Sequence, residues 1–418
     1  MPDTATLRVD PVAGTAEPEP ETRSGPGGTG TRRRLDHIDA MRPIKQFGVV
    51  TTHSLLAFAP AVSAAAGASL LLLHVTREAF LFVSACMLTY GYVGLARTGL
   101  ATFYRRRFVS IGIPYLCWTI IYFAVTYRAA GWSTSFGHFG YLMATGYYQL
   151  YYLLVIAQFY VIFPLVAPAL VRARRWHVRI LVASGVLQLV VVSLQHWSVL
   201  PAWMQGYWAT RELFSYQFYL VAGMIVALHL DDVHRWLLGH VALTLWFTVA
   251  SAAIAEGWYG LATLGHVGWL GAGNDPFQPI VLPFNIGAIA CIYLAGAYLV
   301  APGRTARLRR IIRSGSDNSY GIYLAQMVFI LGLTSLGWSR LAVAIPWPLL
   351  CLVTVVGVVL CCVALTAVLA RTPLSKALTG RSRQPWSTLL PRGVRRPGAG
   401  PDQDEGGSTA EIASAIAT

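Results

Sequence analysis

The most informative absence in this 418-residue sequence is the absence of charge. Only 12% of the residues are charged, whereas soluble domains carry about 25%, and 55% of the residues are hydrophobic. The apolar residues gather in recurring runs of about 20, which is the length that crosses the hydrocarbon core of a bilayer. The composition therefore excludes an ordinary soluble protein. It predicts an all-α, polytopic integral membrane protein with one membrane domain, residues 35–372.

The cysteines lack the spacing that disulfide frameworks or metal sites require. All six fall inside apolar runs, and none forms a CxxC pair or stands at ligand spacing from a histidine. We therefore expect no metal site and no bound cofactor, and we interpret the cysteines as small buried hydrophobic residues. They are Cys86, Cys117, Cys291, Cys351, Cys361 and Cys362.

Both ends of the sequence lack apolar runs. Residues 1–30 are rich in Pro, Gly, Thr and Glu, with no hydrophobic stretch followed by a cleavage site. After residue 374 the chain is again polar and rich in Gly, Pro and Ser. We expect residues 1–34 and 373–418 to be disordered tails.

The hydrophobic runs predict about ten membrane helices. They lie near residues 44–62, 78–96, 108–127, 149–170, 179–196, 212–230, 237–255, 280–300, 319–337 and 343–370. The net charge of +14 comes from short basic clusters between these runs, which indicates membrane topology rather than nucleic-acid binding. If the N-terminus is cytoplasmic, nearly all of the 32 basic residues fall on that side; the exceptions are Arg77, Arg128, Arg211 and Arg340. We therefore predict a multi-pass plasma-membrane protein with both termini in the cytoplasm.

The first apolar run carries a polar stripe with a histidine in its middle. Pro43 fits the first turn of a helix, so this helix is predicted to begin there. Gln46 and His53 share one helical face, and Arg42 lies near the same line at the cytoplasmic end. The rise from Arg42 to His53 is roughly 16 Å, which puts the imidazole about halfway through the hydrocarbon. A histidine at that depth marks either a functional site or a packing contact with a neighbouring helix.

Two further segments place polar groups and cations at cytoplasmic helix ends. Arg105, Arg106 and Arg107 stand where the third helix enters the membrane, and the polar segment 316–321 opens the ninth helix after an arginine-rich loop. Converging arginines and helix N-terminal amides would form a mouth for a polyphosphate. The alternative is that each cluster only sets the topology.

Five segments, in order along the chain, invite comparison with known families. They are LDHIDAMRPIKQFGVVTTHS, REAFLFVSACML, FYRRRFVSIGIPYLCW, YYQLYYLLVIAQFYVIFPL and NSYGIYLAQ. Together they resemble the acyltransferase 3 family of polytopic membrane O-acyltransferases, nearest to the branch with the intercellular-adhesin polysaccharide proteins, over about residues 35–370. The chain departs from the family pattern at Ala85, Ser110 and Gln326, which replace the usual glycine, arginine and histidine.

The resemblance implies an enzyme that moves an acetyl or other short acyl group from acyl-CoA to a hydroxyl of a glycan or of a glycosylated or secondary-metabolite acceptor. It implies that His53 is the catalytic histidine, that Arg42 is its companion, and that Arg106 and Arg107 help to hold the donor. Arg105 completes the expected donor-binding group. The residues expected to line the cavity are Gln46, Glu78, Ser84, Ser319, Tyr320, Tyr323 and Gln326.

Two interpretations stay open at this point. His53 would act as a general base on the acceptor hydroxyl or would accept the acyl group itself. Glu78 would either reach the cavity or serve as a first-turn acid in a helix capped by Thr76.

The rival function is a transporter or exporter of a polysaccharide or lipid-linked intermediate, because mid-membrane His and Arg also mark translocation paths. The absence of an inverted repeat argues against it. The expected partners are therefore acyl-CoA, the acceptor and membrane lipid, and O-acetylation of a cell-surface polysaccharide is one reaction of this class.

Overall fold

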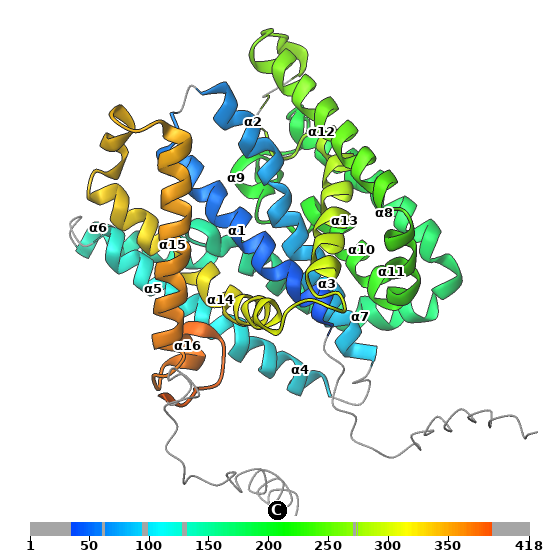
Figure 1. Cartoon of the computed structure of the whole chain (residues 1–418), viewed down its shortest axis with the longest axis horizontal. Helices are drawn as coiled ribbons and strands as arrows, with labels where there is room; N and C mark the ends of the chain where they lie inside the picture. Colours follow the sequence, from blue (N-terminus) through cyan, green and yellow to red (C-terminus); the bar gives the residue numbers. More distant parts are fainter. Residues whose placement is uncertain are drawn as a thin grey trace, which may run out of the picture. The chain divides into compact units, whose positions relative to one another are not determined.

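Helices make up the structured part of the chain (Figure 1). The computed structural model describes residues 35–60, 63–93, 99–127, 132–270, 273 and 275–386. Within these ranges the chain forms α-helices, short 3-10 turns and one π-helical turn, without any strand. The all-α class predicted from the hydrophobic runs is confirmed.

Each predicted membrane helix overlaps one or more of the observed elements. The α-helices are α1 (Asp36–Phe58), α2 (Ala64–Leu73), α3 (Val75–Val93), α4 (Leu100–Arg107), α5 (Ile113–Tyr127), α6 (Trp132–Thr145), α7 (Tyr151–Arg172), α8 (His177–His196), α9 (Gly206–Ala209), α10 (Gln217–Leu228), α11 (Leu230–Gly239), α12 (Val241–Thr263), α13 (Val281–Leu299), α14 (Ala306–Ser335), α15 (Trp347–Leu369) and α16 (Ser375–Thr379). The π-helical turn is η1 (Phe108–Gly112). The 3-10 turns are η2 (Tyr148–Leu150), η3 (Arg174–Trp176), η4 (Ala202–Met204), η5 (Leu213–Tyr216), η6 (Gly268–Leu270) and η7 (Trp338–Val343).

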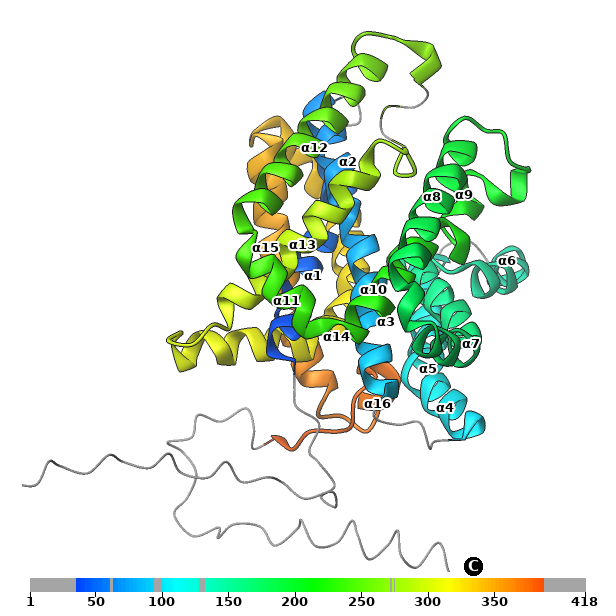
Figure 2. The ribbon, with the colours of Figure 1, turned by 90° about the vertical axis from the view of Figure 1, so that its right-hand side faces the viewer.

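Helix α1 is surrounded by other helices. It packs against α3, α13, α14 and α15, while α3 packs against α10 on another side (Figure 2). Glycine allows the closest approaches: a Cβ on Gly223 of α10 would lie 2.3 Å from the Phe82 carbonyl oxygen of α3. Gly48 of α1 likewise lies closely against Thr76 of α3, and both helices bury polar residues, among them Gln46 of α1 and Glu78 of α3.

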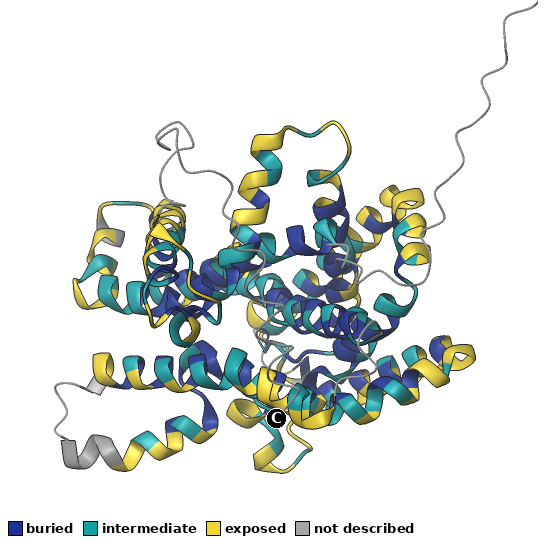
Figure 3. Cartoon of the chain, turned by 90° about the horizontal axis from the view of Figure 1, so that it is seen from below, coloured by how far each residue is buried: buried dark blue, intermediate teal, exposed yellow. Residues whose placement is uncertain are grey.

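Large apolar side chains cover much of the outer surface, as expected where helices meet lipid. Val178 of α8, Trp246 of α12 and Leu360 of α15 are among the exposed ones. Buried residues concentrate where the helices face one another (Figure 3).

Seven helical segments are long and apolar enough to cross a membrane, or up to eight if α10 and α11, bent by 98° at their junction, form one broken span. Helices α1 and α14 fall outside this set because polar and charged side chains lower their mean hydropathy. The total of about ten spans and the cytoplasmic orientation of both termini therefore stay predictions.

The first helix begins earlier than predicted. It starts at Asp36, and Pro43 lies inside it, so the prediction that the helix begins at Pro43 is wrong. A proline inside a helix removes one amide donor, and the helix continues where other contacts hold it. Here Arg313 of α14 lies 3.2 Å from the Asp36 carboxylate, and Pro43 packs closely against Gly315 of the same helix.

The chain beyond the last membrane helix is folded further than predicted. A disordered tail was expected from residue 373, but α16 and the following residues up to 386 are ordered. Tertiary contacts hold them: the Trp118 indole N–H of α5 donates to the Leu378 carbonyl at 2.9 Å. Such contacts leave no signal in a short polar sequence. The expected tails at 1–34 and 387–418 lie outside the described residues.

Candidate functional site

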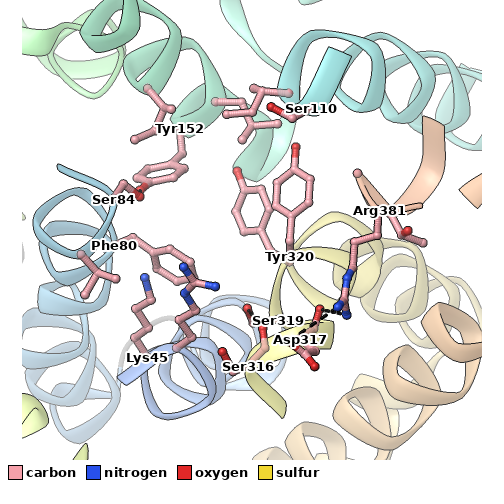
Figure 4. Close-up of a pocket in the computed structure, with 18 of the residues that line it drawn as sticks. Lys45, Phe80, Ser84, Ser110, Tyr152, Ser316, Asp317, Ser319, Tyr320 and Arg381 are labelled. Carbon is pink, nitrogen blue, oxygen red and sulfur yellow. Dashed lines mark hydrogen bonds and ion pairs between the residues drawn. The ribbon is translucent and has the colours of Figure 1, made fainter. Parts of the chain in front are cut away.

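A cavity of about 430 Å³ opens between α1, α3, α7 and α14 (Figure 4). Small-molecule sites commonly measure about 300–1,000 Å³. The end of α4, the π-helical turn η1, and the end of α16 with the residues after it complete its wall. The lining residues are Arg42, Lys45, Phe80, Val83, Ser84, Arg107, Ser110, Ile111, Tyr152, Leu153, Ile156, Tyr160, Ser316, Asp317, Ser319, Tyr320, Tyr323, Thr379, Gly380 and Arg381.

The wall of this cavity carries an excess of positive charge. Its basic residues are Arg42, Lys45, Arg107 and Arg381, and its acidic residue is Asp317. Arg381 donates to the Asp317 carbonyl at 2.7 Å and lies 3.6 Å from its carboxylate. Arg42 lies 3.5 Å from the Asp39 carboxylate, which does not line the cavity. Lys45 and Arg107 are then the cations that favour an anionic ligand, such as a polyphosphate.

Two of these cations have no carboxylate partner among the described residues. Lys45 is only 3% exposed, and its Nζ lies 3.7 Å from the centroid of the Phe80 ring. The Arg107 guanidinium lies 5.1 Å from the Tyr160 ring centroid. A cation–aromatic contact stabilises by about 0.5–2 kcal/mol, less than a buried charge loses on dehydration. Both side chains are therefore suited to binding an anion.

Hydroxyl groups line another part of the wall. The Ser84 and Tyr152 hydroxyls lie 3.4 Å apart, and the Tyr320 and Tyr323 rings stack with centroids separated by 6.4 Å. The Tyr320 hydroxyl and the Ser316 Oγ are buried and have no hydrogen-bond partner among the described residues. Buried polar groups are normally satisfied, so these hydroxyls are available to a ligand.

Two irregular elements shape the wall. The π-helical turn η1 brings Ser110 and Ile111 to the cavity, and such turns often occur at functional sites. Gly380 ends α16 with φ of +67°, and a Cβ there would lie 2.7 Å from the Tyr320 ring. The positive φ and the close approach of the Tyr320 ring both require glycine at this position. The turn at Gly380 directs the chain so that Arg381 reaches the cavity.

His53 does not line this cavity. It is half-buried on α1 and lies roughly 16 Å along the helix from Arg42. Gln46, which lies between them on α1, is 3% exposed, and Gln326 of α14 is fully buried. Neither the amide nitrogen nor the amide oxygen of either glutamine has a hydrogen-bond partner among the described residues. Unpaired buried amides are costly, which makes these glutamines candidates for ligand contacts.

Glu78 also lies outside this cavity. Its carboxylate accepts hydrogen bonds from Arg77 at 2.8 and 3.2 Å, deep in the protein. Thr76 is already within α3, and its hydroxyl bonds to the preceding turn, so the interpretation of Thr76 as an N-cap is wrong.

The structure thus brings only some of the predicted site residues together. Those that line the cavity are Arg42, Ser84, Arg107, Ser319, Tyr320 and Tyr323. Those that lie elsewhere are Gln46, His53, Glu78, Arg105, Arg106 and Gln326; Arg105 and Arg106 are exposed. Sequence reasoning missed Lys45, Tyr152 and Arg381 as lining residues. Lys45 had a signal, because it lies one helical turn after Arg42.

The chemistry of the site therefore has two parts. A cationic cavity can hold a polyanion at one end of α1, and a histidine farther along the same helix can transfer protons. Within the described ranges, no group of three or more His, Cys, Asp or Glu residues could hold a metal ion.

A family model described as an acyltransferase domain matches residues 35–366. The chain belongs to the acyltransferase 3 family. The matched acyltransferase 3 region includes α1, α3, α7 and α14, and it supports a membrane acyltransferase. Comparison with curated proteins and with solved structures gives no match. The position within the intercellular-adhesin branch of the acyltransferase 3 family stays a prediction.

Proposed function

We propose that this protein is a plasma-membrane O-acyltransferase that moves a short acyl group from acyl-CoA to a hydroxyl of a glycan or a glycosylated or secondary-metabolite acceptor. The observation that carries the proposal is a cationic cavity on the helix that bears His53, in a chain of the acyltransferase 3 family. Coenzyme A carries a diphosphate and a 3′-phosphate, which match the excess cations of the wall. Both termini are proposed to be cytoplasmic, where the donor is found.

Lengths along α1 fit this donor. The pantetheine arm of coenzyme A has about a dozen bonds and spans roughly 15 Å when extended, comparable to four or five extended residues. The rise from Arg42 to His53 is roughly 16 Å. A donor whose phosphates lie at this cationic end of α1 can therefore present its thioester near His53.

The reaction then follows from general acid–base chemistry. His53 takes the proton of the acceptor hydroxyl while that oxygen attacks the thioester carbonyl, and the carbon–sulfur bond breaks to release the coenzyme A thiolate, which is then protonated. Gln46 lies between Arg42 and His53 on the same face of α1, and its unpaired amide can form a hydrogen bond with an amide of the pantetheine arm. Arg105 and Arg106 would assist from the exposed surface by attracting the anionic donor.

A transfer assay in proteoliposomes tests this function. Labelled acetyl-CoA is supplied with extracted cell-envelope glycans and secondary metabolites, and acyl transfer is followed by mass spectrometry. His53→Ala is expected to slow transfer by about 10²–10⁴-fold, because it removes the base. His240→Ala is the matched control, since His240 is exposed on another part of the chain.

Two results would contradict the proposal. Equal transfer by His53→Ala and the native protein would exclude His53 as the base. An acceptor that crosses the membrane without any gain in mass would instead indicate a transporter.

A further inference from the structure

Lys45 is a buried cation on the wall of the cavity. It sits on α1, is 3% exposed, and its side chain points into the cavity beside Phe80 (Figure 4). The described residues offer it no carboxylate, and its contact with the Phe80 ring is the interaction that holds its Nζ.

This placement is unfavourable while the cavity is empty. A charged ammonium group loses its hydration when it is buried, and an aromatic ring returns only part of that loss. Arg42, one turn earlier on the same helix, adds a repulsive positive charge from the neighbouring position. An anion in the cavity would relieve both effects, so the site is built for a ligand rather than for stability.

Depth distinguishes Lys45 from the other cations. The side chains of Arg42 and Arg381 are each 34% exposed, whereas Lys45 is almost completely buried. Lys45 and His53 are eight residues apart, which is about 12 Å along the helix. Of the anionic groups of a ligand, the one nearest to its reacting end is therefore the one that contacts Lys45.

We propose that Lys45 binds the phosphate to which the pantetheine arm of the donor is attached, and so sets the distance between that phosphate and the thioester beside His53. The proposal rests on the proposed acyltransferase function. The other phosphates of the donor are then bound by the more exposed cations of the wall, Arg42, Arg107 and Arg381. The ammonium of lysine acts as a compact point charge, which suits a single phosphate at the narrow end.

Donors shortened from the nucleotide end test this assignment. Acetyl-CoA, acetyl-4′-phosphopantetheine and acetyl-pantetheine share one thioester, but only the first two carry the phosphate in question. Lys45→Gln is expected to lower kcat/KM by about 10–100-fold for the first two donors and to leave acetyl-pantetheine unaffected, because only a charge-assisted contact is lost. Lys376→Gln is the matched control, since Lys376 is exposed and outside the cavity.

The loss of kcat/KM with each of the three donors shows which part of the ligand Lys45 contacts. An equal loss with all three donors overturns the assignment, because Lys45 would then act on the acyl group, the acceptor or the fold. If the native protein transfers an acyl group from none of the three thioesters, the proposed acyltransferase function is refuted. The role of Lys45 can then still be tested directly by the binding of coenzyme A.

Thermal unfolding in detergent with and without coenzyme A supplies that direct test. Lys45→Met is expected to raise the melting temperature of the empty protein, because an unpaired buried charge is removed. It is also expected to shrink the stabilisation that coenzyme A gives. A lower melting temperature with an unchanged coenzyme A effect overturns the proposal and makes Lys45 a structural residue.

Discussion

The contact between α3 and α10 gives the sharpest stability prediction. A Cβ added at Gly223 would lie 2.3 Å from the Phe82 carbonyl oxygen and 3.1 Å from the Ala85 Cβ, whereas ordinary contact begins at 3.4 Å. Because the nearest atom belongs to backbone, a side-chain rotation cannot relieve the clash. Gly223→Ala therefore requires the two helices to separate by about 1 Å, which is the difference between ordinary contact at 3.4 Å and the 2.3 Å to the Phe82 oxygen.

The size of the effect follows from two opposing terms. Overpacking costs typically about 1–3 kcal/mol, and a backbone clash lies at the upper end of that range. Replacing glycine by alanine inside a helix returns up to about 1 kcal/mol. We expect a net loss of about 2 kcal/mol and a lower melting temperature, measured by tryptophan fluorescence in detergent.

The same substitution should reduce activity, because α3 carries Phe80, Val83 and Ser84 on the cavity wall. A misplacement of about 1 Å can slow a reaction about 10²-fold. Gly257→Ala on α12 is the matched control: nothing lies within 4 Å of its Cβ position, so this variant should be slightly more stable and equally active. If Gly223→Ala were as stable as Gly257→Ala, the close packing of α3 on α10 would be refuted.

Two other perturbations have definite expectations. Glu78→Gln leaves the Arg77 charge buried without its partner and should lower the free energy of unfolding by about 3–5 kcal/mol. The double variant Arg77→Met with Glu78→Leu should recover most of that loss of stability. The measurement is denaturant unfolding, and purely additive changes in the free energy of unfolding would contradict an ion pair. Arg107→Gln should raise the KM for acyl-CoA about 10-fold in a steady-state transfer assay. Arg105→Gln should raise this KM by less, because Arg107 lines the cavity and Arg105 does not. Equal effects of the two substitutions would place the donor outside the cavity.

Hydrophobic runs predict the long membrane helices of this protein, because burial in lipid requires long apolar segments whatever their neighbours are. Helices α2 and α6 lie between predicted membrane helices and were not predicted. Each predicted membrane helix has an observed counterpart. One break was not predictable: the π-helical turn η1 lies at the start of the predicted segment 108–127, where the sequence gives no sign of it. The sharp bend between α10 and α11, by contrast, coincides with the end of the predicted segment 212–230 and is followed at once by the polar residues Asp231 and Asp232.

Charges were harder to assign than helices. Lys45 belongs to a basic cluster at a helix end that the sequence predicts to be cytoplasmic, where a positive charge ordinarily sets the topology. Its burial depends on α3, which places Phe80 over its ammonium group. Arg381 lies beyond the last membrane helix, and only the packing of α16 brings it to the cavity. Periodicity within a single helix carries no record of such contacts.

The division of α1 into two ends explains how a highly charged donor could serve a reaction centre inside a membrane. The cations of the cavity wall gather near Arg42, whereas His53 lies roughly 16 Å farther along the helix. A phosphate carried to the depth of His53 would lose its hydration at great cost. The pantetheine arm of the proposed donor is uncharged, and its two amides need only hydrogen bonds, which the unpaired amides of Gln46 and Gln326 can provide. The charged half of the proposed donor would therefore stay at the cationic end, and only a neutral chain would have to reach the histidine.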